Sequence, residues 1–179
     1  MTGRIIKNVS KARQSELNLL FPNIIEQVYG YKEDMPGYSW VAISIFDHWL
    51  FSDEHHLINE VPVHVNLERL QLLHSFTRKL VEETEVLTFR CRGKRKDKVK
   101  FKSFTSDKAA NIYCESSTES TPINSLYVII LPKYKCIINE SRDYTNHLYY
   151  RDKELVSPLL QMVNNHGLKT IKEMNRHVY

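Results

Sequence analysis

The sequence predicts an α+β fold built on a mostly antiparallel or mixed β-sheet, with helices packed on one side and a protruding basic β-hairpin. Two patterns indicate this class: segments of period two occur in consecutive groups, and segments of helical period separate the groups without regular βαβ alternation. The length of 179 residues is enough to bury a core without a disulfide or a metal. We therefore expect residues 1–179 to form a single α+β domain.

The N-terminal part predicts a broken helix followed by two strands. Ser10 is a suitable N-cap, apolar residues recur from there toward Gly30, and Pro22 interrupts the pattern. Residues 38–51 mix aromatic and β-branched side chains on both faces, which indicates a central strand. Residues 57–65 alternate between apolar and polar, so we expect a half-exposed strand near a sheet edge.

The longest helix is expected to begin at an Asn66 cap, because apolar residues then recur every three or four positions as far as Val81. After the hairpin, a short helix is expected over 106–113. The Ser/Thr-rich segment 115–125 has the composition of a mobile surface loop. Further strands are expected at 126–131, 136–138 and 147–150, and a last helix at about 152–166.

The basic β-hairpin, about residues 88–102, carries the strongest local signal. Over the whole chain, 25 Lys and Arg oppose 21 Asp and Glu, a net charge of +4. Residues 90–102 hold eight of the basic residues and one Asp, which gives +7, and the 17 basic and 20 acidic residues elsewhere give −3. In both strands apolar residues alternate with cations, so pairing the apolar sides together places the strand cations on one face.

Three interpretations of the hairpin are open. Its cations suit the phosphates of a nucleic acid, since a two-stranded ribbon fits a major groove. They also suit an acidic protein surface, whose association they would accelerate. Alternatively, they protect exposed strand edges from pairing with other chains and bind nothing. Between the two binding interpretations, the acidic remainder of the chain favours an acidic protein partner, because it offers no second stripe of basic and aromatic residues.

The residues expected to bind this partner come from two segments. The hairpin supplies cations, and segment 141–151 supplies Arg and Tyr, which suit interfaces because they combine contact area with hydrogen bonding. The full set is Arg90, Arg92, Lys94, Arg95, Lys96, Lys98, Lys100, Lys102, Arg142, Tyr144 and Tyr149.

Metal and catalytic patterns are weak. Potential metal ligands gather between Asp53 and His64, but a strand spreads positions four apart by about 13 Å, too far for three of them to meet one ion. These ligands are Asp53, Glu54, His55, His56, Glu60 and His64. We expect them to form a polar loop and a solvent-facing strand side.

Nucleophilic chemistry has one conceivable pair, Cys136 with His147, but the apolar strand expected around Cys136 is typical of an inert buried thiol. The carboxylates Glu82, Glu83 and Glu85 do not match the spacing of a metal-dependent nuclease. With only five glycines, the chain has no glycine-rich phosphate loop.

We expect the protein to be cytoplasmic and not bound to a membrane. Cys91, Cys114 and Cys136 are odd in number and widely spaced, as expected of reduced thiols. The first ten residues lack the apolar core of a signal peptide, and no apolar run reaches the length of a membrane span.

The sequence thus favours a noncatalytic interaction protein with no cofactor and no bound metal. The concrete hypothesis is a bacterial immunity or inhibitor protein that neutralises a partner toxin by direct binding, on an analogy of size and character. A nucleic-acid-binding protein that uses the hairpin is the first alternative. A small metal-dependent hydrolase or nuclease is the second.

Overall fold

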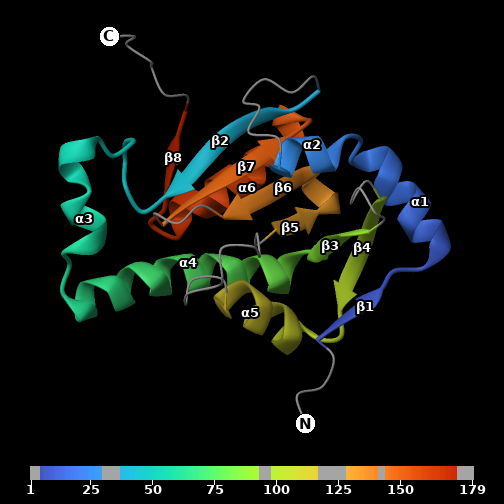
Figure 1. Ribbon diagram of the computed structural model, residues 1–179, viewed down its shortest axis with the longest axis horizontal. Coiled ribbons are helices and arrows are strands. Elements are labelled where there is room, and N and C mark those ends of the chain that lie inside the picture. Colours follow the sequence, from blue (N-terminus) through green and yellow to red (C-terminus); the bar gives the residue numbers. More distant parts are fainter. Residues whose placement is uncertain (1–4, 30–36, 93–97, 117–127, 141–143, 173–179) are drawn as a thin grey trace.

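The β-sheet of the computed structural model has eight strands, all paired antiparallel, in the order β1-β4-β3-β5-β6-β7-β2-β8 (Figure 1). The structure describes residues 5–29, 37–92, 98–116, 128–140 and 144–172. The strands are β1 (Ile6–Asn8), β2 (Ser39–Ser44), β3 (Leu87–Arg92), β4 (Lys98–Phe104), β5 (Val128–Leu131), β6 (Cys136–Glu140), β7 (Thr145–Tyr150) and β8 (Lys169–Ile171).

The connections between strands are mainly helical. The α-helices of the described ranges are α1 (Lys11–Leu20), α2 (Ile24–Tyr29), α3 (His56–Asn59), α4 (Val63–Glu83), α5 (Asp107–Ser116) and α6 (Lys153–Asn165). Two 3-10 turns, η1 (Ser52–Glu54) and η2 (Pro132–Tyr134), complete them. The expected α+β class with an antiparallel sheet is confirmed.

Helices cover both faces of the sheet, which corrects the expectation of helices on one side. The core on one face joins α4, α5 and α6 to the sheet and includes Phe76 and Leu159. The core on the other face joins α1 and α2 to β3 and β4 and includes Leu17, Phe21 and Phe101. The physical reason lies in β5, where all four residues are buried and alternate between the two cores. A strand apolar on both faces needs cover on both.

Among the described residues, the joint between β3 and β5 has the least backbone pairing in the sheet, a single pair of Leu87 with Ile130. Tyr113 of α5 reinforces it. The Tyr113 hydroxyl lies 3.0 Å from Thr88 Oγ1 and 3.4 Å from both the backbone nitrogen and oxygen of Val128. Burial raises the pKa of this phenol, so it stays a neutral donor and acceptor. Beyond the joint, β4 and β1 run in a clearly different direction from β2 and β7 (Figure 1).

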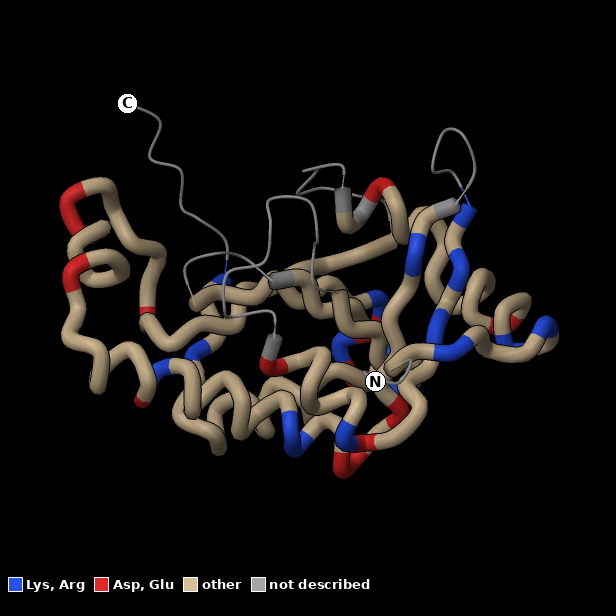
Figure 2. The backbone as a smooth tube through the Cα atoms, turned by 60° about the horizontal axis from the view of Figure 1, so that its bottom comes forward, with Lys and Arg blue, Asp and Glu red and all other residues tan. Residues whose placement is uncertain are grey.

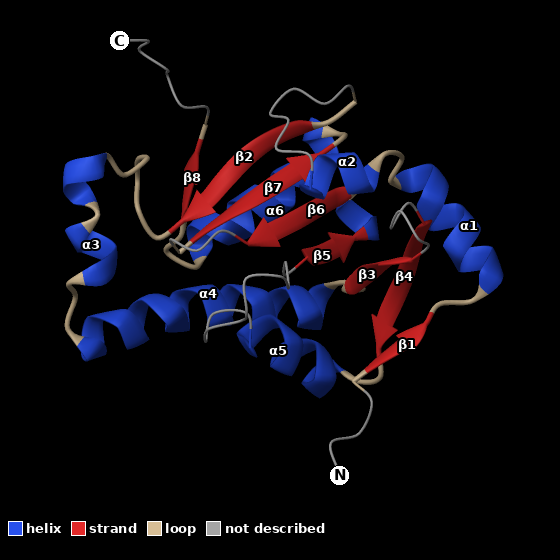
Figure 3. Cartoon of the chain, viewed as in Figure 1, coloured by secondary structure: helices blue, strands red, loops and turns tan. Residues whose placement is uncertain are grey.

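The prediction of a strand at residues 57–65 is wrong. Helix α3 and the first turn of α4 occupy this segment, with Pro62 as the N-cap of α4 (Figure 3). Leu57, Val61 and Val65 are spaced by four, so the pattern fits a helical period as well as an alternating one. Asn66 therefore lies within the helix and does not cap it.

Other boundaries agree more closely with expectation. Ser10 caps α1, its hydroxyl accepting a hydrogen bond from Arg13 N at 3.1 Å. Gly167, with φ of 76°, follows α6 in the left-handed conformation that favours glycine. The strand expected over 38–51 ends at Ser44. Strands β1 and β8 were not expected, because three residues give too short a pattern.

The Ser/Thr-rich segment expected to be a loop overlaps the end of α5 at 115–116. From residue 117 to 125 it lies outside the described residues, as does the hairpin tip, 93–97. Mobility of the loop and protrusion of the hairpin therefore stay predictions.

Replacing Tyr113 with Phe should lower the free energy of unfolding by about 1–2 kcal/mol, because the change leaves polar groups at the β3–β5 joint without their shared partner. Urea denaturation followed by circular dichroism measures this. Tyr134→Phe is the matched control: Tyr134 is also buried, and its hydroxyl bonds no described residue, so its loss should change stability by less than about 0.5 kcal/mol. Equal effects of the two variants would contradict the role of Tyr113.

Candidate functional site

The cations of β3 and β4 share one face of the sheet. Arg92 pairs with Lys98, Arg90 with Lys100, and Thr88 with Lys102 in the antiparallel register. Side chains alternate along a strand, so these positions lie on the face opposite that of Phe89 and Phe101, which pack under α1 and α2. The pairing expected from the sequence is thus present. We call Arg90, Lys98, Lys100 and Lys102 the cationic face; the side chain of Arg92 lies outside the described part of the structure, so its binding role stays a prediction.

Three members of the cationic face are exposed and free of ion pairs. Arg90, Lys98 and Lys100 are solvent-exposed, and no carboxylate of the described residues forms an ion pair with them. Like charges directly opposite one another across strands destabilise the pairing. Figure 2 shows Lys and Arg concentrated along β3 and β4 at one end of the molecule, and Asp and Glu around η1 and α3 at the other. An external anion would relieve the repulsion.

Lys102 has a structural role within the cationic face. Its side chain is buried, with 3% exposed, and its Nζ donates a hydrogen bond to Asn8 Oδ1 of β1. Lys102 therefore holds the last residue of β1 against β4 and is out of reach of a docking surface.

The remaining residues expected to bind a partner are not brought to the cationic face. Tyr149 lies on the opposite face of the sheet, its ring stacked on His147 at 6.2 Å. The Tyr144 hydroxyl donates to Asn66 Oδ1, and its ring faces the guanidinium of Arg69 at 5.7 Å. Lys94, Arg95, Lys96 and Arg142 lie outside the described residues, so their binding role stays a prediction.

A contact that sequence reasoning missed joins α1 to the outer edge of β4. Gln14 Oε1 accepts a hydrogen bond from Phe101 N at 3.0 Å, and Gln14 Nε2 donates to Val99 O at 3.2 Å. An ion pair between Arg13 and Glu85 fixes the same helix from its other side. Glu85, one of the carboxylates weighed for a nuclease, is thus part of a structural ion pair. Only the long sequence separation hid these contacts.

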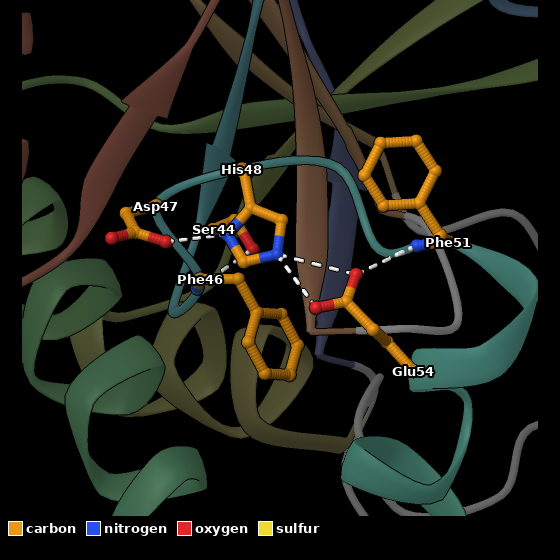
Figure 4. Close-up of polar contacts among 6 residues, drawn as sticks. All are labelled: Ser44, Phe46, Asp47, His48, Phe51 and Glu54. Carbon is orange, nitrogen blue, oxygen red and sulfur yellow. Dashed lines mark hydrogen bonds and ion pairs between the residues drawn. The ribbon is translucent and has the colours of Figure 1, made fainter.

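The connection after β2 holds a polar cluster around His48 (Figure 4). His48 Nδ1 lies 2.6 Å from Asp47 Oδ1, and Nε2 lies 3.0 Å from Glu54 Oε1. Hydrogen bonds to Asp47 and then Glu54 raise the pKa of His48. The pKa of Glu54 is lowered first by the hydrogen bond from Phe51 N, at 2.9 Å, and then by His48. His48 is therefore held between two carboxylates, and both contacts favour the protonated form of its ring.

A nucleophile beside this cluster is not in a reactive setting. Ser44 is buried; its Oγ accepts from Phe46 N at 3.1 Å and shares a hydrogen bond with Thr145 Oγ1 at 3.0 Å. The described residues contain no group of three His, Cys, Asp or Glu side chains arranged to hold a metal ion. The potential ligands between Asp53 and His64 were expected to form a polar loop and one side of a strand. They are instead spread over η1, α3, the first turn of α4 and the turns between these elements.

The conceivable pair of Cys136 with His147 is not formed. Cys136 lies in the core beneath α4, α5 and α6, whereas His147 lies on the opposite face, its ring 5.6 Å from that of Trp40. Burial also raises the pKa of the Cys136 thiol, which suppresses the nucleophilic thiolate.

Comparison of the chain with protein-family models, curated proteins and solved structures finds no match. Among the described helices, none combines the length and apolar character needed to cross a bilayer.

Titration of His48 should show a midpoint above the ordinary value of about 6.5, because both ring nitrogens face carboxylates. The ion pairs then stabilise the connection at pH values below the ordinary pKa of His48 and are lost as the pH rises through the raised one. They are also lost as the pH falls through the lowered pKa of Glu54. Proton NMR of the imidazole measures the midpoint.

Asp47→Asn should bring that midpoint back toward the ordinary value, since it removes the larger of the two causes. Glu68→Gln, which removes a carboxylate at an exposed position of α4, is the control and should leave the midpoint unchanged. A wild-type midpoint at or below about 6.5 would refute the assignment.

Proposed function

We propose that this protein is a noncatalytic interaction protein that binds an acidic protein partner through the exposed part of its cationic face, Arg90, Lys98 and Lys100. The observation that carries the proposal is the placement of these three exposed cations on one face, two of them directly opposite each other, without a carboxylate partner among the described residues. A partner's carboxylates would replace this repulsion with attraction.

Protection of the sheet edge explains the position of these cations less well than partner binding does. The outer edge of β4 is already occupied, by β1 from Lys102 to Phe104 and by the Gln14 amide at Val99 and Phe101. Lys98 and Lys100 would protect the part of this edge that no strand pairs, but Arg90 lies on β3, which is not an edge strand of the sheet. A binding role explains why Arg90, on the inner strand, joins the lysines of β4 on the same face.

Nucleic acid is the competing ligand, and one feature weighs against it. Single-stranded nucleic acids are held by aromatic platforms interleaved with cations. The aromatic residues of β3 and the adjoining half of β4, Phe89 and Phe101, are buried on the opposite face. Within this proposal, the concrete form remains an immunity or inhibitor protein that neutralises a toxin by direct binding, an analogy of size and character.

The experiment reverses the charges of the cationic face in the full-length chain. The test variant changes Arg90, Lys98 and Lys100 to Glu. The control changes the exposed residues Lys153 of α6 and Lys169 and Lys172 at β8 to Glu, which alters the net charge equally but leaves β3 and β4 unchanged. Each tagged chain is used to capture partners from the native host, with and without nuclease treatment.

Wild type and control should both retain a stoichiometric protein partner that resists nuclease and dissociates as salt rises from 50 to 300 mM, and the test variant should lose it. If nuclease treatment abolishes capture of the partner, the nucleic-acid alternative replaces this proposal. A partner held equally by the test variant, or no stoichiometric partner for wild type, would refute a binding role for the cationic face. Circular dichroism confirms that both variants are folded.

A further inference from the structure

The outer edge of β4 extends beyond the strand that covers it. β1 pairs with β4 only from Lys102 to Phe104, its last residue being Asn8 opposite Lys102. β4 continues from there to Lys98, and the chain of β1 turns away into α1. Val99 and Phe101 direct backbone groups to this edge, because both bond to Gln14 there. Lys100, between them, directs its backbone groups to β3, as alternation in an antiparallel ladder requires.

Gln14 takes the place of a neighbouring strand at this edge. One carboxamide accepts from the N–H of Phe101 and donates to the C=O of Val99, so it satisfies the two groups that flank Lys100. An added β-strand makes these same two bonds with its backbone. Gln14 Nε2 also donates to Asn18 Oδ1 at 3.1 Å, so the carboxamide has a partner on its own helix as well as on β4.

Two clefts lie along this edge, one on each side of the Gln14 contact. The first, of about 470 Å³, is lined by polar and apolar residues, among them Val9, Lys11, Ser15, Lys100 and Phe101. The second, of about 450 Å³, is lined by Lys98 and Val99 of β4 and by apolar residues at the α1–α2 corner, among them Phe21, Pro22, Ile24 and Ile25. Gln14 and Lys100 line both clefts, and we call the two clefts together the groove beside β4.

We propose that this groove binds an extended segment of the acidic partner, which adds to the edge of β4 as a strand and displaces the Gln14 amide. The inference rests on the proposed function and specifies how the partner is recognised. The two sides of β4 dictate the sequence of the segment. Side chains beside Lys98 and Lys100 must be acidic, and those beside Val99, toward the α1–α2 corner, must be apolar. The segment therefore alternates acidic and apolar residues.

The probe is a fluorescein-labelled hexapeptide in which Glu and Val alternate, and its control is the isomer with three Val followed by three Glu. Fluorescence anisotropy with the full-length protein should give at least 10-fold tighter binding of the alternating peptide. Lys100→Glu should weaken that binding at least 10-fold. Gln14→Ala should strengthen it about 5- to 10-fold, because two competing hydrogen bonds are removed. Gln161→Ala, on the exposed side of α6, is the control and should change nothing.

Backbone N-methylation separates strand addition from simple charge attraction in the wild-type protein. Alternate amides of a strand face its neighbour, so methylating the three Val amides or the three Glu amides should abolish binding in one case and preserve it in the other. Equal binding of the two isomers would overturn strand addition. Binding that survives methylation of the Val amides and also methylation of the Glu amides would overturn it too. Partner capture that still depends on Arg90, Lys98 and Lys100 would then leave the proposed function standing. Capture that is independent of those cations would refute the proposed function whatever the peptides do.

Discussion

The two-sided burial of the central strands is the constraint on which the rest of the structure depends. Every residue of β5 is buried, and alternate residues belong to different cores, so neither face of the sheet can be left to solvent. Helices α4, α5 and α6 supply one cover, and α1 and α2 supply the other. Because α1 and α2 cover the end of the sheet near β3 and β4, the apolar side of the hairpin is buried there and its cations face the other way.

The same arrangement makes the repulsion on the cationic face tolerable. Opposed like charges cost each strand pair on the order of 0.2–1 kcal/mol. On the reverse side, Phe89 lies opposite Phe101, with ring centroids 6.4 Å apart, and both are buried under α1. Burial of one such ring contributes roughly 1.5–3 kcal/mol, which outweighs the repulsion. The hairpin can therefore keep unneutralised cations on one side without a counter-charge from its own chain.

The fold class and the hairpin could be predicted because both depend on local periodicity. The alternation in β3 and β4 identifies their faces, and Ser10 shows where α1 begins. The segment 57–65 was predicted wrongly as a strand, because the positions of Leu57, Val61 and Val65 fit both a helix and a strand. Only the packing of the whole fold decides between the two. The coverage of both faces was missed for a similar reason, since a buried strand gives no signal of which helix covers each side. Of the candidate site, the cations were predictable, whereas Gln14 was not, because its partners are 85 and 87 residues away.

The cations and the backbone edge of β4 would make separate contributions to binding of a partner, and Lys100 lies where the two meet. Exposed cations act over about a Debye length, close to 10 Å at 0.1 M salt, so they govern how fast an acidic surface is attracted. Backbone hydrogen bonds along β4 act only at contact and are little screened by salt, so they govern how long the partner stays. With Gln14 in place, the edge groups of Val99 and Phe101 are satisfied when no partner is bound. The Gln14 contact therefore reduces pairing of this edge with unrelated chains. A partner strand would displace Gln14 only if its backbone hydrogen bonds and its charges together bind more strongly than the two Gln14 hydrogen bonds.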